Sequence, residues 1–121
     1  MTTQEIADKL VELCRQGQAM EAISTLYAQD IVSVEGTPMP DGTREMHGLD
    51  AVRGKSEWWM SEHEVHSATV EGPLVSDARF CVRFVYDITN KTSGNRITMD
   101  ELAVYLVKDG KIVREEFFYG A

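Results

Sequence analysis

The stretch from Ile97 to Tyr119 most constrains the fold of this chain. Two runs with strand character meet at Asp109-Gly110, a dipeptide that favours a tight β-hairpin turn. A hairpin with one face in water alternates apolar and polar residues, but here both faces of the first strand carry apolar side chains, with acids between them. We therefore expect a sheet that is covered on both sides, in which the acids need a cavity, a partner or water.

The length of this turn decides which acids share a face of the sheet. A two-residue turn at Asp109-Gly110 would place Glu101 beside Arg114, Glu116 and Phe118. A three-residue loop starting at Lys108, with Gly110 left-handed in a bulge, would place Glu101 beside Val113, Glu115, Phe117 and Tyr119. Because a shift of one residue exchanges the two sets, the hairpin residues alone leave both registers open.

Composition indicates one domain over residues 1–121 and limits its partners. A chain of 121 residues can form one core, and its 43% apolar content is typical of globular proteins. The net charge of -8, with no cluster of Lys and Arg, argues against nucleic acid or an anionic membrane as partner. No run is long enough to span a membrane, and the polar N-terminus does not resemble a signal peptide. We expect a cytoplasmic protein in which Cys14 and Cys81 are buried thiols.

Hydrophobic spacing predicts helices first and strands afterwards. Helices are expected from a capping box at Thr2 to a stop at Gly17, and then over residues 18–27 and 49–63. A short strand at 31–35 and an exposed loop at 36–46 separate the last two helices, and strands at 65–74 and 79–89 precede the final hairpin. The order predicts an α+β fold, in which helices pack on one face of a curved antiparallel sheet.

Several short motifs together resemble the SnoaL-like branch of the nuclear-transport-factor-2-like (NTF2-like) superfamily, which includes the ketosteroid isomerases. They are LYAQD at 26–30, SVE at 33–35, GLDAV at 48–52 and DGKIV at 109–113, followed by FFY at 117–119. The motifs span nearly the whole chain in the order that this family shows. The resemblance implies a cone-shaped half barrel whose wide end is closed by three N-terminal helices around a mostly apolar pocket, and often a dimer through the other side of the sheet.

The same resemblance assigns side chains to the two faces of the sheet, and it favours the three-residue hairpin loop. The pocket would then be lined by Tyr27, Trp59, Met99, Glu101, Tyr105, Glu115, Phe117 and Tyr119. On the long preceding strand, the inward residues would be Cys81, Arg83 and Val85. A homodimer would form through the outward residues Phe80, Val82, Phe84 and Tyr86.

Glu35 is the first candidate for catalysis. It follows the short strand at the point where, by resemblance, the ketosteroid isomerases hold the carboxylate that shuttles a proton. A carboxylate beside an apolar pocket is suited to general-base catalysis near neutrality, whereas the alternative is a solvated acid at a strand end. The two donors that stabilise the enolate in those enzymes align with Leu10 and Ala103. Steroid isomerisation is therefore not expected, because that stabilisation is usually the largest catalytic contribution.

Glu101 and Glu115 are the second candidates, because they lie on adjacent strands. Two carboxylates on one face repel unless one is protonated or a cation such as Arg83 lies between them. With Glu35, these residues would form either a catalytic cluster or a buried salt bridge without chemistry.

No metal site is expected from the histidines. His63 and His66 do not have the spacing of a helical zinc-binding pair, and His47 lies apart from them in the sequence.

The leading hypothesis is a SnoaL-like enzyme that performs acid–base chemistry without a cofactor on a small, apolar, oxygen-bearing ligand. The reaction could be isomerisation, cyclisation or hydration. Two other hypotheses stay open: a non-catalytic domain that binds small molecules, and a dimerising module whose pocket is vestigial. A fold by itself does not decide among them.

Overall fold

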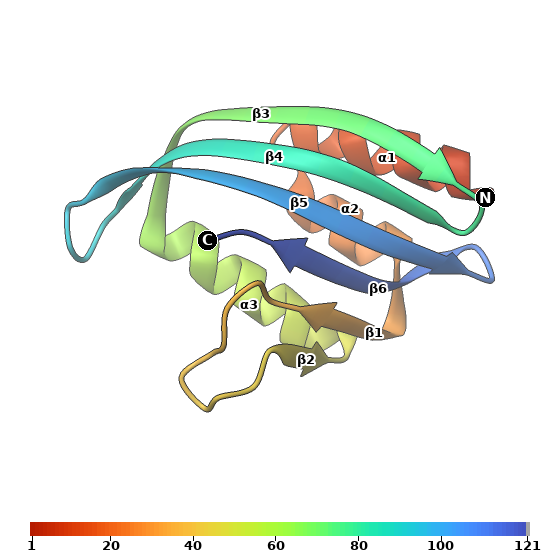
Figure 1. The fold of residues 1–121 in the computed structure, drawn as a ribbon, viewed down its shortest axis with the longest axis horizontal. Coiled ribbons are helices and arrows are strands. Elements are labelled where there is room, and N and C mark those ends of the chain that lie inside the picture. Colours follow the sequence, from red (N-terminus) through yellow and green to blue (C-terminus); the bar gives the residue numbers. More distant parts are fainter. Residues whose placement is uncertain (121) are drawn as a thin grey trace.

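The computed structural model describes residues 1–120, which form three helices and one six-stranded sheet (Figure 1). The helices are α1 (Thr3–Arg15), α2 (Ala19–Leu26) and α3 (Leu49–Glu62). The strands are β1 (Tyr27–Val34), β2 (Glu45–His47), β3 (His63–Ser76), β4 (Arg79–Asn90), β5 (Arg96–Lys108) and β6 (Lys111–Phe118). The predicted α+β class is confirmed. Within residues 1–120, no helix is long and apolar enough to cross a membrane.

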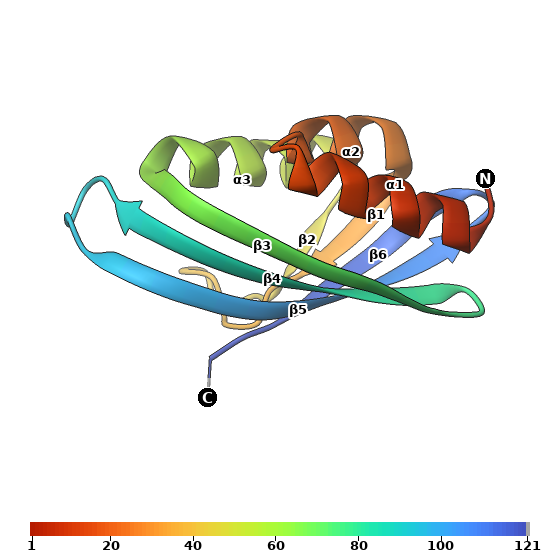
Figure 2. The same cartoon turned by 90° about the horizontal axis from the view of Figure 1, so that it is seen from above.

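The sheet is mixed rather than purely antiparallel, which corrects the expectation from the sequence. The strand order is β2-β1-β6-β5-β4-β3, and β3 to β6 form the expected antiparallel meander. Strand β1 pairs with β6 in parallel; the two strands are far apart in the sequence, so no hairpin fixes their relative direction. Figure 2 shows the three helices on the concave side of the curved sheet. The result is the cone-like NTF2-like arrangement.

The ends of α1 follow the sequence signals. The Thr2 hydroxyl accepts a hydrogen bond from the Glu5 N–H at 3.1 Å, and the Glu5 carboxylate accepts one from the Thr2 N–H at 2.9 Å. After α1, Gly17 adopts a φ of +73°, which is favourable for glycine and ends the helix. Strand β2 was missed, since a loop was expected there. Its three residues are polar or half-exposed and lack the alternation that marks a strand.

The β5–β6 hairpin reaches the expected face assignment by a different geometry. Lys108 pairs with Lys111, so the loop has two residues, Asp109 and Gly110, with φ of +52° and +75°. The expected three-residue loop is therefore wrong. The register then shifts, because Val107 pairs with Ile112 whereas Leu106 pairs with Arg114, and this β-bulge leaves Val113 unpaired. Beyond the bulge, Tyr105 lies opposite Glu115, and these two share a face with Glu101 and Phe117.

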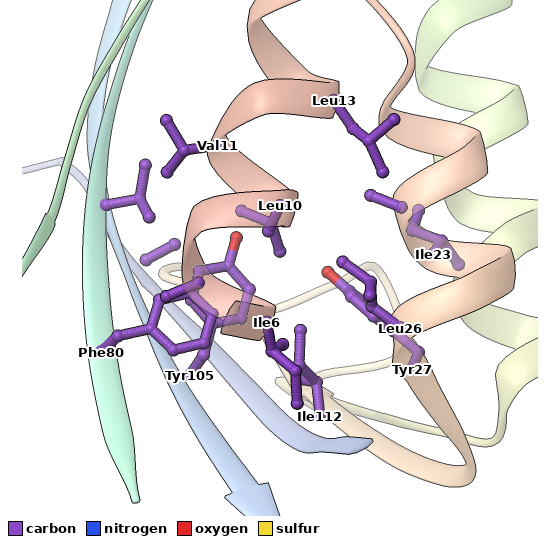
Figure 3. Close-up of a cluster of buried hydrophobic side chains, with 14 of the residues drawn as sticks. Ile6, Leu10, Val11, Leu13, Ile23, Leu26, Tyr27, Phe80, Tyr105 and Ile112 are labelled. Atoms are coloured by element: carbon purple, nitrogen blue, oxygen red, sulfur yellow. The ribbon is translucent and has the colours of Figure 1, made fainter. Parts of the chain in front are cut away.

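The core lies between α1, α2 and the concave face of the sheet. Figure 3 shows Ile6 and Leu10 of α1 packed between the sheet residues Phe80, Tyr105 and Ile112 and the residues of α2. The rings of Phe80 and Tyr105 stack, with their centroids 4.6 Å apart. This apolar layer sets the distance between helices and sheet.

Strand β4 faces opposite to the way that was expected. Phe80, Val82 and Phe84 are at most 3% exposed beneath the helices, and Tyr86 follows them on the concave face. The β4–β5 register explains this, because Phe84 pairs with Glu101 and so shares its side of the sheet. A dimer through Phe80, Val82, Phe84 and Tyr86 is therefore excluded for this fold. The outward residues are Cys81, Arg83 and Val85. If β4 faced the other way, the guanidinium of Arg83 would be buried and the aromatic rings of Phe80 and Phe84 would be exposed to water.

Candidate active site

A hollow of about 420 Å³ lies between the three helices and the concave sheet. Its wall is mostly apolar and aromatic and includes Tyr27, Trp59, Met99, Tyr105, Phe117 and Tyr119. Among the described residues that line it, four are charged at neutral pH in their ordinary state: Glu35, Lys55, Glu101 and Glu115. Concave apolar hollows with a few convergent polar groups are the usual sites for small ligands.

Glu115 is the most deeply buried of these charged groups. Its side chain comes from β6, and the residue is only 3% exposed. The Tyr27 hydroxyl donates a hydrogen bond to Oε2, and the Ser33 hydroxyl donates to Oε1 at 2.8 Å. Burial raises the pKa of Glu115, while the charge of Lys55 and the bonds from Tyr27 and Ser33 oppose that rise. Tyr27 therefore lines the hollow and also donates a hydrogen bond to the buried carboxylate.

Lys55 supplies the cation of the site, a role that the sequence analysis gave to Arg83. Its Nζ donates to the Ser33 hydroxyl at 3.1 Å and forms an ion pair with Glu35. The ammonium also lies 5.2 Å from the centre of the Phe117 ring. Helical spacing could have identified it, because Lys55 lies three residues after the buried Val52 and four before Trp59 on α3.

Arg83 lies outside the site, which corrects the expected assignment. Its guanidinium is on the convex face of the sheet, where its side chain is 45% exposed. It binds the Asp100 carboxylate through two nitrogens, at 2.9 and 2.7 Å, and Glu71 at 3.2 Å. Arg83 was expected to point inward because the two faces of β4 were assigned the wrong way round.

Glu35 lies inside the hollow rather than in solvent at a strand end. The residue directly follows β1, and its backbone N–H donates to the Arg44 carbonyl at 2.8 Å. Its side chain is 17% exposed. One carboxylate oxygen pairs with Lys55, and the other accepts a hydrogen bond from the Tyr119 hydroxyl at 3.0 Å.

Glu101 also faces the hollow, but within residues 1–120 its carboxyl group has no hydrogen-bond partner. Burial, and secondarily the charge of Glu35, raise its pKa to about 7; Lys55 opposes this rise, and Glu115 adds to it. Glu101 therefore exchanges its proton near neutral pH, and its carboxyl group is free to contact a ligand.

An aromatic wall continues from these polar groups toward β3. The Trp59 ring lies 5.6 Å from the Tyr86 ring and stacks on His63 at 4.6 Å. Its neighbour Trp58 is 61% exposed, so only one of the two adjacent tryptophans faces inward. The sequence analysis missed Tyr86 of the lining and Ser33 behind it, as it missed Lys55.

The other histidines lie apart from this wall. His66 contacts the Thr89 hydroxyl at 2.7 Å, and His47 lies 3.2 Å from the Glu45 carboxylate.

Comparison with known proteins gives the same architecture. A candidate SnoaL-like polyketide cyclase from Mesorhizobium loti, whose description adds carbohydrate phosphatase in brackets, is 45% identical with a TM-score of 0.93; the match covers 98% of this chain and 100% of that chain. A candidate isomerase from Bacillus subtilis is 16% identical with a TM-score of 0.78, over 99% of this chain and 90% of that chain. A protein from Catenulispora acidiphila with a ketosteroid isomerase-like fold, solved with trimethylamine, is 19% identical with a TM-score of 0.73, over 96% of this chain and 85% of that chain.

The two structures below 25% identity show a shared fold only. A search of curated proteins finds no match to the sequence. The family model for the SnoaL-like domain matches residues 1–119, almost the full chain. The motifs, the cone-shaped sheet with its three helices and this match lead to one conclusion: the chain belongs to the SnoaL-like domain family.

Proposed function

We propose that this protein is a cofactor-free acid–base enzyme that moves a proton on a small, apolar, oxygen-bearing molecule. One observation carries the proposal: two carboxyl groups at the same hollow have different environments. Glu35 forms an ion pair with Lys55 and accepts a hydrogen bond from the Tyr119 hydroxyl. Glu101 has a pKa of about 7 and keeps its proton in a large part of the molecules at neutral pH. Two carboxyl groups in such different environments, one paired with a cation and one buried without a partner, are the usual pattern of a catalytic base and acid.

In this proposal, Glu35 takes a proton from the carbon beside a carbonyl group. The electron pair of the broken C–H bond forms the C=C bond of an enol, and the carbonyl oxygen takes the proton of Glu101. In a β,γ-unsaturated ketone, Glu35 returns its proton to the γ carbon while the enol O–H returns its proton to Glu101, and the product is an isomer with a shifted C=C bond. In a molecule with a second carbonyl group, the enol carbon attacks that carbonyl carbon, its oxygen takes the electron pair of the C=O π bond and the proton of Glu35, and the enol O–H returns its proton to Glu101 as the ring closes. The aromatic wall of Trp59, Tyr105 and Phe117 would bind the apolar part of the substrate and exclude water.

The relatives support proton-transfer chemistry but not the steroid reaction. The similar structures include a candidate polyketide cyclase and a candidate isomerase, and both names are compatible with proton transfer at carbon. Leu10 is buried in the core and Ala103 is a small residue of β5, so neither supplies the donor that the steroid isomerases have at these positions.

A non-catalytic binding domain is the second candidate, and one observation favours it. Both oxygens of Glu35 are already engaged, by Lys55 and by Tyr119. A substrate C–H group would therefore have to share or displace one of these contacts to reach the carboxylate. The binding function would use the same hollow without any proton transfer.

The two candidates differ in one measurable reaction, the exchange of ketone hydrogens for deuterium. β-Tetralone, a small bicyclic ketone, is incubated with the protein in D₂O, and the signals of the hydrogens beside its carbonyl are followed by NMR. We expect the protein to accelerate this exchange. Glu35→Gln should lower the accelerated rate by about tenfold or more, because a general base usually contributes about 10²–10⁴-fold to the rate.

Glu57→Gln is the matched control, because Glu57 lies exposed on α3 and the charge change is the same. Its exchange rate should equal that of the unmodified protein. Binding of β-tetralone without accelerated exchange would contradict the enzyme and favour the binding domain.

A homodimer is also proposed, now through the convex face of the sheet. Leu102 of β5 and Phe118 of β6 pair with each other there and are 47% and 49% exposed. Apolar side chains exposed together on a sheet face are typical of an interface between proteins. Arg83 and Asp100 form an ion pair beside them, so this face combines an apolar centre with a polar margin.

Leu102→Asp should convert the dimer to a monomer, because a carboxylate would be buried without a partner at the interface. Sedimentation velocity at micromolar concentration measures the change. Trp58→Asp, at an exposed position of α3 away from the sheet, should leave the dimer intact. A monomeric unmodified protein at high concentration would exclude this part of the proposal.

A further inference from the structure

We infer that Lys55 binds the oxygen of the ligand, and that the ligand is therefore an uncharged molecule with a carbonyl or similar acceptor oxygen. Lys55 was absent from the sequence-based set of site residues. The inference rests on the proposed function for the place where the ligand binds, the hollow between helices and sheet. It does not depend on whether a reaction follows.

The ammonium of Lys55 has a donor left for a ligand. A lysine side chain carries three N–H donors and no acceptor. One goes to the Ser33 hydroxyl at 3.1 Å and one to Glu35. Lys55 lines the hollow together with Phe117, whose ring centre is 5.2 Å from Nζ. Among residues 1–120, no hydrogen-bond acceptor is found for the third N–H, and because Lys55 lines the hollow this donor is available to a ligand there.

Buried residues fix the position of this ammonium. Ser33 is fully buried, and its hydroxyl donates to Glu115 at 2.8 Å, so it is the oxygen of Ser33 that accepts from Lys55. Glu115 is in turn held by the Tyr27 hydroxyl. The chain Tyr27–Glu115–Ser33–Lys55 joins β1, β6 and α3, and it holds a flexible side chain in one place. Ser33 and Glu115 are thus positioning residues for Lys55, and preorganised donors lose little entropy on binding.

Lys55 and Glu101 together replace donors that this chain lacks. Neither Leu10 nor Ala103 can donate a hydrogen bond from its side chain. Lys55 enters the hollow from α3 and Glu101 enters it from β5, the opposite wall. A carbonyl oxygen between them would accept one charge-assisted bond and one O–H bond against a mostly apolar wall, where such bonds are stronger than in water.

The charges of the hollow exclude anionic ligands as the preferred class. Within the described part of the chain, Lys55 is the single cation of the lining. The negative charges of Glu35 and Glu115 act on the same part of the hollow, since each of them raises the pKa of Glu101. A carboxylate or phosphate ligand would meet these two acids as well as the lysine. A neutral carbonyl gains the bond from Lys55 without that repulsion.

The test compares two ligands that differ only in one oxygen, β-tetralone and the hydrocarbon tetralin. Their dissociation constants are measured by NMR titration for the unmodified protein and for Lys55→Met. We expect Lys55→Met to weaken β-tetralone relative to tetralin by about tenfold or more, the usual contribution of a hydrogen bond to a charged group. The ratio of the two dissociation constants is compared between the two proteins. A general change in the hollow affects both ligands and cancels, so the comparison isolates the contact with the oxygen.

Two further variants make the result interpretable. Arg53→Met lies on an exposed position of α3 and removes the same charge, and it should change neither dissociation constant. Removing Lys55 leaves Glu35 without its partner, so the double variant Lys55→Met, Glu35→Gln is measured too, with thermal unfolding as the check of folding. It should show the same loss of preference for the ketone.

Two results overturn the inference: an equal loss of both ligands on Lys55→Met, or no preference change in the double variant. Absence of binding by both ligands to the unmodified protein overturns it as well, together with the proposed pocket. Failure of the enzyme hypothesis looks different. In that case deuterium exchange is absent while the Lys55-dependent preference for the ketone persists.

Discussion

Phe80→Ala is expected to lower the free energy of unfolding by about 3–5 kcal/mol, the usual range for removing a fully buried aromatic ring. The residue is 2% exposed, and its ring stacks on Tyr105 beneath α1. Its loss leaves a cavity at the centre of the layer that joins helices to sheet, and it removes the stacking contact as well. Urea denaturation followed by circular dichroism gives the change.

Phe118→Ala is the matched control, because it removes the same ring from the opposite face of the sheet. Phe118 is 49% exposed, so the protein should lose less than about 1 kcal/mol. Measurements at low protein concentration avoid a contribution from dissociation of the proposed dimer. Similar losses for both variants would mean that the faces of the sheet are assigned wrongly.

The residues of β4 themselves indicate which face of the strand is buried. One face of the strand carries Phe80, Val82 and Phe84, and the other carries Cys81, Arg83 and Val85. Burying the first set removes two aromatic rings from water and leaves a guanidinium in solvent. The opposite assignment came from the family resemblance rather than from this comparison of side chains. Burial energy alone would have given the correct face.

The position of Lys55 in the pocket could also have been predicted from the sequence. It shares a helical face with Val52 and Trp59, and Trp59 was expected to line the pocket. The residue expected between Glu101 and Glu115 was Arg83, on a strand of the sheet. The helices that cover a sheet contribute polar groups to the same cavity, and the helical period places Lys55 among them.

Other features depend on tertiary packing and could not be read from the sequence. The bulge at Val113 brings Glu115 and Phe117 to the side of Glu101, yet Ile112 and Val113 are equally apolar β-branched residues. Only the space under α1 and α2, which Ile112 fills, determines which of the two points inward. The contacts of Glu115 with Tyr27 and Ser33 follow from the parallel pairing of β1 and β6, which joins segments more than 80 residues apart.

Glu101→Gln is expected to stabilise the protein above pH 7, the opposite of the usual effect of a substitution inside a fold. Burial and the charge of Glu35 raise the pKa of Glu101 from 4.5 to about 7 in the folded state. Between these values the folded protein binds more protons than the unfolded chain, so stability falls as the pH rises. At about 1.36 kcal/mol per pH unit, the carboxylate costs up to roughly 3 kcal/mol once the pH exceeds 7. Glutamine keeps the shape of the neutral acid and removes this cost.

Urea denaturation at several pH values between 4 and 8 measures the difference between the variant and the unmodified protein. We expect almost no difference near pH 4.5 and a gain of about 2–3 kcal/mol at pH 8. Glu35, Lys55 and Glu115 face Glu101 and are present in both proteins, so the comparison largely cancels their own contribution. Glu57→Gln, on the exposed side of α3, should show no such trend.

A difference that does not change with pH would mean that Glu101 is an ordinary solvated acid, and the proposed catalytic acid would be lost with it. The expected trend has the opposite meaning. A chain that keeps an unpaired carboxyl group inside its fold, at a cost that one substitution removes, gives up stability at this position. Such a cost is typical of groups retained for function. If Glu101→Gln gains stability and also loses the exchange of β-tetralone hydrogens, both results have one cause, the proton that Glu101 holds near neutral pH.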